Sequence, residues 1–161
     1  MIRPRPMRCT AMPGAAVLFC PWLYLRLSQR IDSNTSPPSV PSIEEARLCV
    51  HAYLGDHPVD DPVVDPLSAD LTGLPPMLIQ AATGDARLAD AKALAIRARE
   101  QGVSATLELY PVDAHVFQLF WSFLPEAADA IDFAGNYIRE VRSGLAKPIQ
   151  ARASASRSHR V

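Results

Sequence analysis

Residues 74–120 read LPPMLIQAATGDARLADAKALAIRAREQGVSATLELYPVDAHVFQLF, and their pattern predicts a strand, a helix and a second strand. The apolar run 77–82 is the first strand, and residues 103–110 contain the second. Between them, residues 87–101 carry an apolar stripe at helical spacing, and Gly102 follows where a left-handed C-terminal cap belongs. This order predicts a right-handed crossover between two parallel strands.

The flanking residues extend the same alternation in both directions. Residues 15–20, AAVLFC, form an unbroken apolar run, which is typical of a strand buried in a parallel sheet. A Ser-x-x-Glu capping box at Ser42 predicts a helix over residues 42–54. Pro125 begins a last helix, whose expected buried stripe is Ile131, Ala134, Ile138 and Val141. We therefore predict an α/β fold with about three parallel strands and flanking helices.

The domain is expected to cover residues 13–143. Residues 1–12 and 144–161 lack apolar periodicity and are expected to be disordered. Both outer strands of a three-stranded sheet would be edges, and an apolar run such as residues 15–20 makes a poor edge. We therefore expect the domain to be part of a larger sheet.

The composition is that of an ordinary globular protein and excludes several classes. Of the 161 residues, 48% are hydrophobic and 20% charged, and the net charge of -1 gives no basic face for nucleic acid. The longest apolar stretch, residues 15–25, contains Pro21 and is too short to span a bilayer. No secretory cleavage site follows it, so we expect a cytoplasmic protein.

The three cysteines, Cys9, Cys20 and Cys49, are odd in number and lack Cys-x-x-Cys spacing. This usage favours reduced thiols and gives no sign of a disulfide framework or a metal site. We expect no cofactor and no metal.

Two side chains with acid–base chemistry follow the two strands of the opening stretch. Asp85 comes just after the strand 77–82, and His115 comes just after the strand 103–110. The carboxyl ends of parallel strands lie at one edge of a sheet, where ligands bind, so we expect the two side chains to meet. A carboxylate that orients a histidine is half of a serine-nucleophile triad. The alternatives are a helix N-terminal acid for Asp85 and an ordinary surface histidine for His115.

Three segments in order carry a resemblance to a known family. They are AAVLFCPWLYL at residues 15–25, PLSADLTGLPPMLIQ at residues 66–80 and YPVDAHVFQLF at residues 110–120. Together they resemble the C-terminal half of the hormone-sensitive-lipase-like branch of the α/β-hydrolase superfamily, over about residues 13–141. The resemblance implies a partial α/β-hydrolase fold that holds the last three of eight strands.

The same resemblance implies roles for individual residues. Family members place the triad acid after the seventh strand and the histidine before a Val-Phe pair, which here gives Asp85 and His115 as the catalytic acid and base. Asp90 is a competing acid inside the helix pattern, and we prefer Asp85. Residues 42–54 resemble part of the cap over the acyl pocket. Trp22, Phe117 and Phe120 are candidate substrate-binding residues, with ordinary core packing as the alternative for each.

The departures from the family pattern set the functional expectation. The sequence has no Gly-x-Ser-x-Gly nucleophile elbow and no His-Gly-Gly-Gly segment for an oxyanion hole. We therefore expect a truncated carboxylic-ester hydrolase, an esterase or lipase by family, that has little activity alone. Cys20 or Ser28 would be the substitute nucleophile if activity were found.

Two other functions stay open at this stage. The first is an interaction module that forms a homo-oligomer or pairs with a full-length paralogue or a separately encoded N-terminal half, since the last strand and its helix often make the dimer contact in this family. The second is a small α/β binding domain unrelated to hydrolases.

Overall fold

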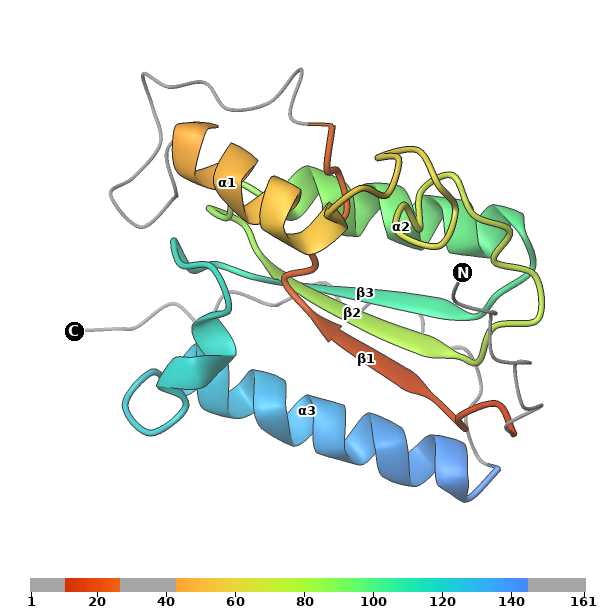
Figure 1. Ribbon diagram of the computed structural model, residues 1–161. Coiled ribbons are helices and arrows are strands. Elements are labelled where there is room, and N and C mark those ends of the chain that lie inside the picture. The colour runs from red at the N-terminus through yellow and green to blue at the C-terminus, as the bar shows by residue number, and fades with distance from the viewer. Residues whose placement is uncertain (1–10, 27–42, 145–161) are drawn as a thin grey trace.

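Three parallel strands form the sheet in the computed structural model, which describes residues 11–26 and 43–144. The elements run in the order β1 (Ala16–Phe19), α1 (Ile43–Leu54), β2 (Met77–Ala82), α2 (Leu88–Glu100), β3 (Ala105–Tyr110), the 3-10 helix η1 (Phe117–Phe120) and α3 (Pro125–Arg142). The strand order is β1-β2-β3, with α1 and α2 on one side of the sheet and α3 on the other (Figure 1). The predicted α/β architecture is confirmed.

The central strand β2 is buried along its whole length. It pairs in parallel with β1, where Phe19 lies opposite Gln80, and with β3, where Tyr110 lies opposite Ala82. Because side chains alternate across a strand, β2 presents one set of residues to each helical layer. Such burial on both faces explains why the sequence shows an unbroken apolar run rather than an alternating one.

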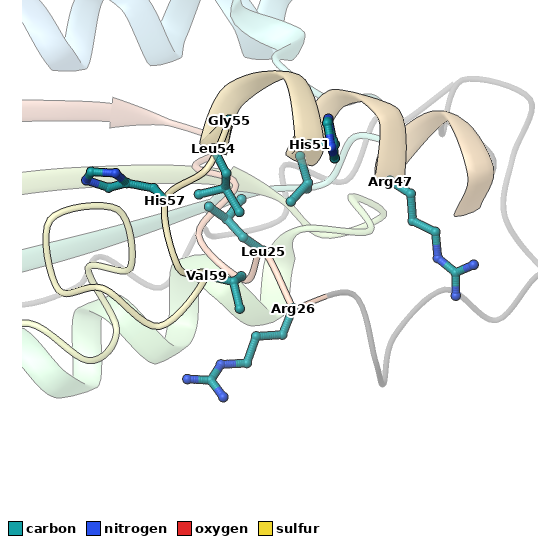
Figure 2. A pocket seen from close by; sticks show the side chains of 9 residues that line it. Leu25, Arg26, Arg47, His51, Leu54, Gly55, His57 and Val59 are labelled. Carbon is teal, nitrogen blue, oxygen red and sulfur yellow. The ribbon is translucent and has the colours of Figure 1, made fainter.

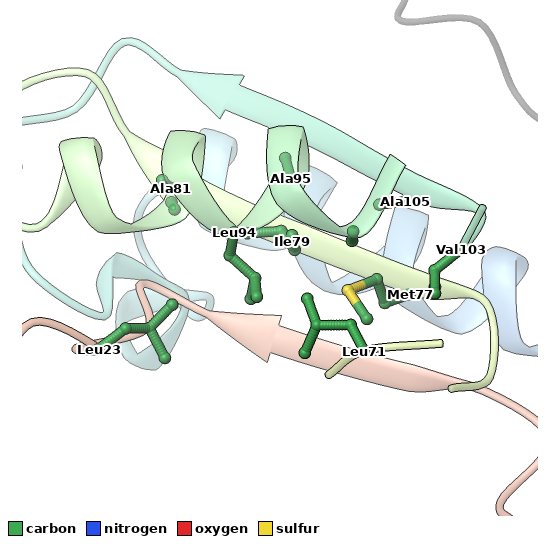
Figure 3. Packing of buried hydrophobic residues seen from close by; sticks show 11 residues of the cluster. Leu23, Leu71, Met77, Ile79, Ala81, Leu94, Ala95, Val103 and Ala105 are labelled. Carbon is green, nitrogen blue, oxygen red and sulfur yellow. The ribbon is translucent and has the colours of Figure 1, made fainter. Parts of the chain in front are cut away.

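The larger core cluster lies between the sheet and α2. Met77, Ile79 and Ala81 of β2 pack there against Leu94 and small α2 residues (Figure 3). The predicted α2 stripe is confirmed, because Ala91, Leu94, Ala95 and Ala98 are all buried. Gly102 has a φ of +77°, which is the left-handed cap that the sequence predicts.

The predicted stripe of α3 is confirmed for Ala134, which is buried, and for Val141, which packs against the core, but it is wrong for Ile131 and Ile138. The buried residues of this helix are Ala127, Ala130, Ala134 and Tyr137, whereas Ile131 and Ile138 are exposed. Successive helical residues are rotated by about 100°, so a stripe displaced by one residue turns to another side of the helix. The small alanines let α3 approach Leu78 and Ala82 on the second face of β2.

The element boundaries differ from the predicted ones by at most two residues. The strand predicted at 15–20 is Ala16–Phe19, and the strand predicted within 103–110 is Ala105–Tyr110. The helix predicted at 42–54 is Ile43–Leu54. The segments predicted to be disordered, 1–12 and 144–161, lie almost wholly outside the described residues. Within the described ranges, no helix is both long enough and apolar enough to cross a membrane.

The packing of α2 predicts that truncating two of its side chains to alanine has very different effects on stability. Leu94 is 3% exposed in the core, whereas Ile96 on the same helix is 56% exposed. Leu94→Ala should lower the free energy of unfolding by about 2–5 kcal/mol, because it removes buried apolar contacts and leaves a cavity. Ile96→Ala should stay within about 0.5 kcal/mol of the wild type. Urea unfolding monitored by circular dichroism measures both, and equal losses would contradict the described packing.

Candidate active site

Asp85 lies in the tight turn between β2 and α2. The turn is closed by hydrogen bonds from the Asp85 amide to the Ala82 carbonyl (3.2 Å) and from the Leu88 amide to the Asp85 carbonyl (3.0 Å). The side chain is fixed as well, because the Arg87 amide donates to Asp85 Oδ1 at 2.8 Å. The second carboxylate oxygen, Oδ2, is thereby left to face the loop after β3.

Gly84 lets the two loops approach each other. A β-carbon at this position would lie 2.9 Å from the Cα of Asp113, in the loop after β3, and would meet the Asp113 side chain. The Gly84 amide also donates to the Val112 carbonyl at 3.1 Å. A residue without a side chain is therefore needed where the loops that carry Asp85 and His115 touch.

His115 projects from the loop after β3 onto Asp85. Its Nδ1 lies 3.0 Å from Asp85 Oδ2, and the imidazole side chain is 39% exposed whereas the carboxylate side chain is 1% exposed. An ionised carboxylate only accepts hydrogen bonds, so Nδ1 carries the proton and Nε2 of the neutral ring keeps its lone pair. The side chains lie together at one end of the sheet, as the strand pattern predicts. Their catalytic role stays a prediction.

Electrostatics keep the Asp85 carboxylate charged. Burial works to raise the pKa of Asp85, but the hydrogen bonds from His115 and from the Arg87 amide outweigh it and hold the pKa below its usual value. An ionised carboxylate in this position can accept the hydrogen bond from the Nδ1 proton and orient the imidazole, as the acid of a triad does.

Asp90, the competing acid, binds backbone amides of the segment after β1 instead of the imidazole. Its Oδ2 accepts hydrogen bonds from the amides of Leu23 at 2.9 Å and Tyr24 at 3.0 Å. Those contacts tie the start of α2 to the segment that leaves the sheet. The geometry therefore sets Asp85, and not Asp90, against the imidazole.

A buried polar network that the sequence did not reveal lies beneath the pair. Gln80 Nε2 donates to the Ala130 carbonyl at 2.8 Å, Gln118 Nε2 lies 3.3 Å from Gln80 Oε1, and the Cys20 Sγ lies 4.0 Å from Gln118 Oε1. Gln80 lies within the apolar run of β2, and Gln118 lies among the aromatic residues of η1. An amide side chain among apolar residues is the only sign of this network in the sequence.

Cys20 ends β1 with a φ of +46° and is 2% exposed. Burial and, to a lesser extent, the nearby Asp85 carboxylate raise the pKa of its thiol to about 11. A buried thiol that keeps its proton at neutral pH is a poor nucleophile. Ser28, the other substitute nucleophile considered, lies outside the described residues.

The three candidate substrate-binding aromatics have different surroundings. Phe117 is fully buried, and its ring centroid lies 5.1 Å from that of Tyr110. Trp22 is half-buried beneath the guanidinium of Arg87, 4.1 Å from the ring centroid. Phe120 is 38% exposed beside Phe123. Core packing accounts for Phe117, and substrate contact stays a prediction for all of them.

A surface pocket of about 420 Å³ lies beside α1. Figure 2 shows Leu25, Leu54 and Val59 gathered in it, while the guanidinium groups of Arg26 and Arg47 extend outward. Neither the Asp85–His115 pair nor any of the three candidate aromatics lines this pocket. The helix α1 lies over the end of the sheet to which the β1 arrow points (Figure 1). Asp85 follows β2 and His115 follows β3, so the pair lies at this same end of the parallel sheet.

Comparisons with known proteins agree with this architecture. The chain is 32% identical over 131 residues to an acetyl-hydrolase of Streptomyces hygroscopicus, a match that covers 81% of this chain and 44% of the relative. It is 34% identical over 122 residues to an esterase of Acinetobacter venetianus, covering 74% of this chain and 40% of that protein. The chain thus spans less than half the length of these relatives.

Solved structures of esterases and lipases also match this chain over less than half of their own length. An esterase from the bacterial hormone-sensitive lipase family superposes with a TM-score of 0.74 at 35% identity, covering 86% of this chain and 46% of its own. A hormone-sensitive lipase from a metagenome library superposes with a TM-score of 0.70 at 33% identity, covering 80% and 44%. The family model described as alpha/beta hydrolase fold matches residues 3–119. The sheet, the loop geometry and these matches together establish that the chain belongs to the alpha/beta hydrolase fold family.

Proposed function

We propose that this chain supplies the acid and the base of a carboxylic-ester hydrolase, with His115 as general base and Asp85 as its orienting carboxylate. The observation that carries the proposal is the 3.0 Å contact between His115 Nδ1 and the buried Oδ2 of Asp85. The serine and the oxyanion hole come from a segment outside these 161 residues, because the sequence contains neither motif.

The proposed reaction moves one proton through His115. Nε2 accepts the proton of the serine hydroxyl as its oxygen attacks the ester carbonyl, and the imidazolium that forms is stabilised by the Asp85 carboxylate. As the ester C–O bond breaks, the imidazolium gives the proton to the departing alkoxide, which leaves as an alcohol while the acyl group stays on the serine oxygen. Water then attacks the acyl-serine while Nε2 takes its proton, and the imidazolium returns this proton to the serine oxygen as the carboxylic acid is released.

The pair alone is inert in this proposal. Stabilisation of the oxyanion is usually the largest catalytic contribution, and the described loops offer His115 no serine to activate. A chain limited to these residues is therefore a truncated hydrolase that hydrolyses esters only when a complementing segment is supplied.

We place the acyl chain in the pocket beside α1. Leu25, Leu54 and Val59 contribute apolar side chains to its lining, and α1, the helix that the resemblance assigns to the cap, supplies one side of it. This assignment joins the cap-like helix and the acid–base pair in one site at the carboxyl end of the sheet.

A second function is favoured by the outer edge of β1. In the described sheet β1 pairs only with β2, so its other edge has unpaired backbone groups, which are a template for another strand. In this alternative the chain is a non-catalytic module that forms a homo-oligomer or pairs with a separate N-terminal half. Light scattering on the pure chain, and on its mixture with such a half, distinguishes a self-pairing module from a complementing one.

The acid–base proposal predicts that the chain has no esterase activity by itself and gains activity when a complementing segment is added. The pure chain should hydrolyse a short-chain aryl ester no faster than buffer, and mixing it with an N-terminal half that carries Gly-x-Ser-x-Gly should produce turnover. In that mixture His115→Ala and Asp85→Asn should each lower kcat by about 10³-fold or more. The exposed Asp132→Asn on α3 is the matched control and should leave kcat unchanged. Turnover by the pure chain above the rate in buffer, or a complemented enzyme that keeps its kcat in His115→Ala, would contradict the proposal.

The acyl-pocket assignment predicts a change in chain-length preference. Leu54→Trp should fill the pocket and raise KM for a hexanoyl ester by about 10-fold in the complemented enzyme, with little effect on an acetyl ester. Leu48→Trp on the same helix is the control, because Leu48 is 71% exposed and does not line the pocket. Equal effects on both esters would place the acyl chain elsewhere.

A further inference from the structure

Three metal-ligating side chains meet where the three strands end. One ligand atom from each of Cys20, Asp85 and His115 can be chosen so that all lie within 4.8 Å of one another. Each residue follows a different strand, so residues far apart in the sequence are brought together by the parallel pairing. The chemistry proposed above uses Asp85 and His115 but gives Cys20 no part.

The donor set is one that Zn²⁺ takes in proteins. Thiolate, imidazole and carboxylate are its three usual protein ligands, and three of them with a fourth position open to solvent is the common arrangement of an accessible zinc site. Here Cys20 and Asp85 are buried, whereas His115 is exposed on one side. The cluster therefore has fixed ligands inside and an entry path past the imidazole.

The distances suit a single small ion. Two ligand atoms held about 2.1 Å from Zn²⁺ lie roughly 3.0–3.4 Å apart, and Nδ1 and Oδ2 are 3.0 Å apart here. The ligand atoms of the cluster lie within 4.8 Å of one another, so the two that are furthest apart have to approach by about 1 Å to share one ion with a thiolate bond of about 2.3 Å. A rotation of the exposed His115 ring or a small shift of its loop supplies such a movement.

The surroundings favour a cation on balance. The Arg87 amide donates to Asp85 Oδ1, so the carboxylate ligand is oriented by a further hydrogen bond. The Cys20 thiol donates to Gln118 Oε1 at 4.0 Å, and this hydrogen bond is given up when the thiol loses its proton on binding the ion. The Arg87 guanidinium is the nearby opposing charge, but it faces both Asp85 and Asp90 and lies over the Trp22 ring. Asp85 and the Cys20 thiolate therefore give the ion two negative ligands, while Arg87 divides its charge between Asp85 and Asp90.

We propose that Cys20, Asp85 and His115 form a binding site for Zn²⁺ at the carboxyl end of the sheet. On binding, the thiol gives its proton to solvent and the imidazole proton moves from Nδ1 to Nε2, so that sulfur, nitrogen and oxygen all present lone pairs to the ion. Nε2 then no longer accepts a proton. Zinc would therefore switch off the general base, a consequence that rests on the proposed hydrolase function, whereas the binding itself does not.

The test uses Co²⁺ as a spectroscopic substitute for Zn²⁺ on the full chain. The starting protein is the Cys9→Ser, Cys49→Ser variant, in which Cys20 is the only remaining thiol. Adding Co²⁺ should produce a near-ultraviolet thiolate-to-cobalt band together with intense tetrahedral visible bands, and one equivalent of Zn²⁺ should remove both. Circular dichroism of each variant confirms that it has kept its helices.

Substitutions then identify the ligands. Cys20→Ser should abolish the thiolate band, with Cys20→Ala as a second variant, and His115→Ala and Asp85→Asn should each weaken Co²⁺ binding by about 10-fold or more. His57→Ala is the matched control, because His57 forms a separate surface pair with Asp61 at 3.5 Å. A missing thiolate band in the starting protein, or bands unchanged in both His115→Ala and Asp85→Asn, would overturn the proposal. Hydrolysis is not measured here, so either outcome leaves the acid–base proposal to its own test.

Discussion

The parallel pairing of β2 with both of its neighbours is the constraint on which the rest of the molecule depends. All six residues of β2 are buried, and its register with β1 and β3 aligns the ends of the strands at one edge of the sheet. Cys20, Asp85 and His115 each follow one of those ends, so the sheet itself brings a thiol, a carboxylate and an imidazole together. Gly84 completes the arrangement. Any side chain at this position would push the loop after β2 away from Asp113, which lies in the loop after β3.

The polar groups beneath the site link it to the opposite helical layer. Gln80 is fully buried in the middle of an apolar strand, a position that is costly unless its amide is satisfied. The Ala130 carbonyl in α3 and the Gln118 side chain in η1 satisfy it, and Gln118 in turn faces the Cys20 thiol. These hydrogen bonds therefore connect α3 to the residues beneath the site. A displacement of α3 would move Gln80 and Gln118 and so change the hydrogen bonding of Cys20.

Sequence reasoning reached the strands and helices because their apolar runs are long and lie between strong breakers, such as Pro76 before β2 and Gly102 after α2. It reached the Asp85–His115 contact because strand order alone puts both loops at one edge. It predicted Ala134 of α3 correctly but mistook Ile131 and Ile138 for buried residues, since apolar patterning favours isoleucine, whereas close approach to the sheet requires small residues such as Ala127 and Ala130. It considered Cys20 only as a substitute nucleophile and gave no ligand role to it, because its place beside the pair depends on side-chain direction at a residue with positive φ, which no spacing rule reports.

The central claim is that Asp85 fixes the tautomer of His115, which leaves Nε2 free to act as a base. Nitrogen-15 NMR of the imidazole in chelator-treated protein at neutral pH tests this most directly. The claim predicts a proton on Nδ1 with a strongly downfield proton resonance, an unprotonated Nε2, and the loss of that resonance in Asp85→Asn, because the acceptor in the 3.0 Å contact has then lost its charge. A His115 ring protonated on Nε2 alone, or a spectrum unchanged by Asp85→Asn, would contradict it.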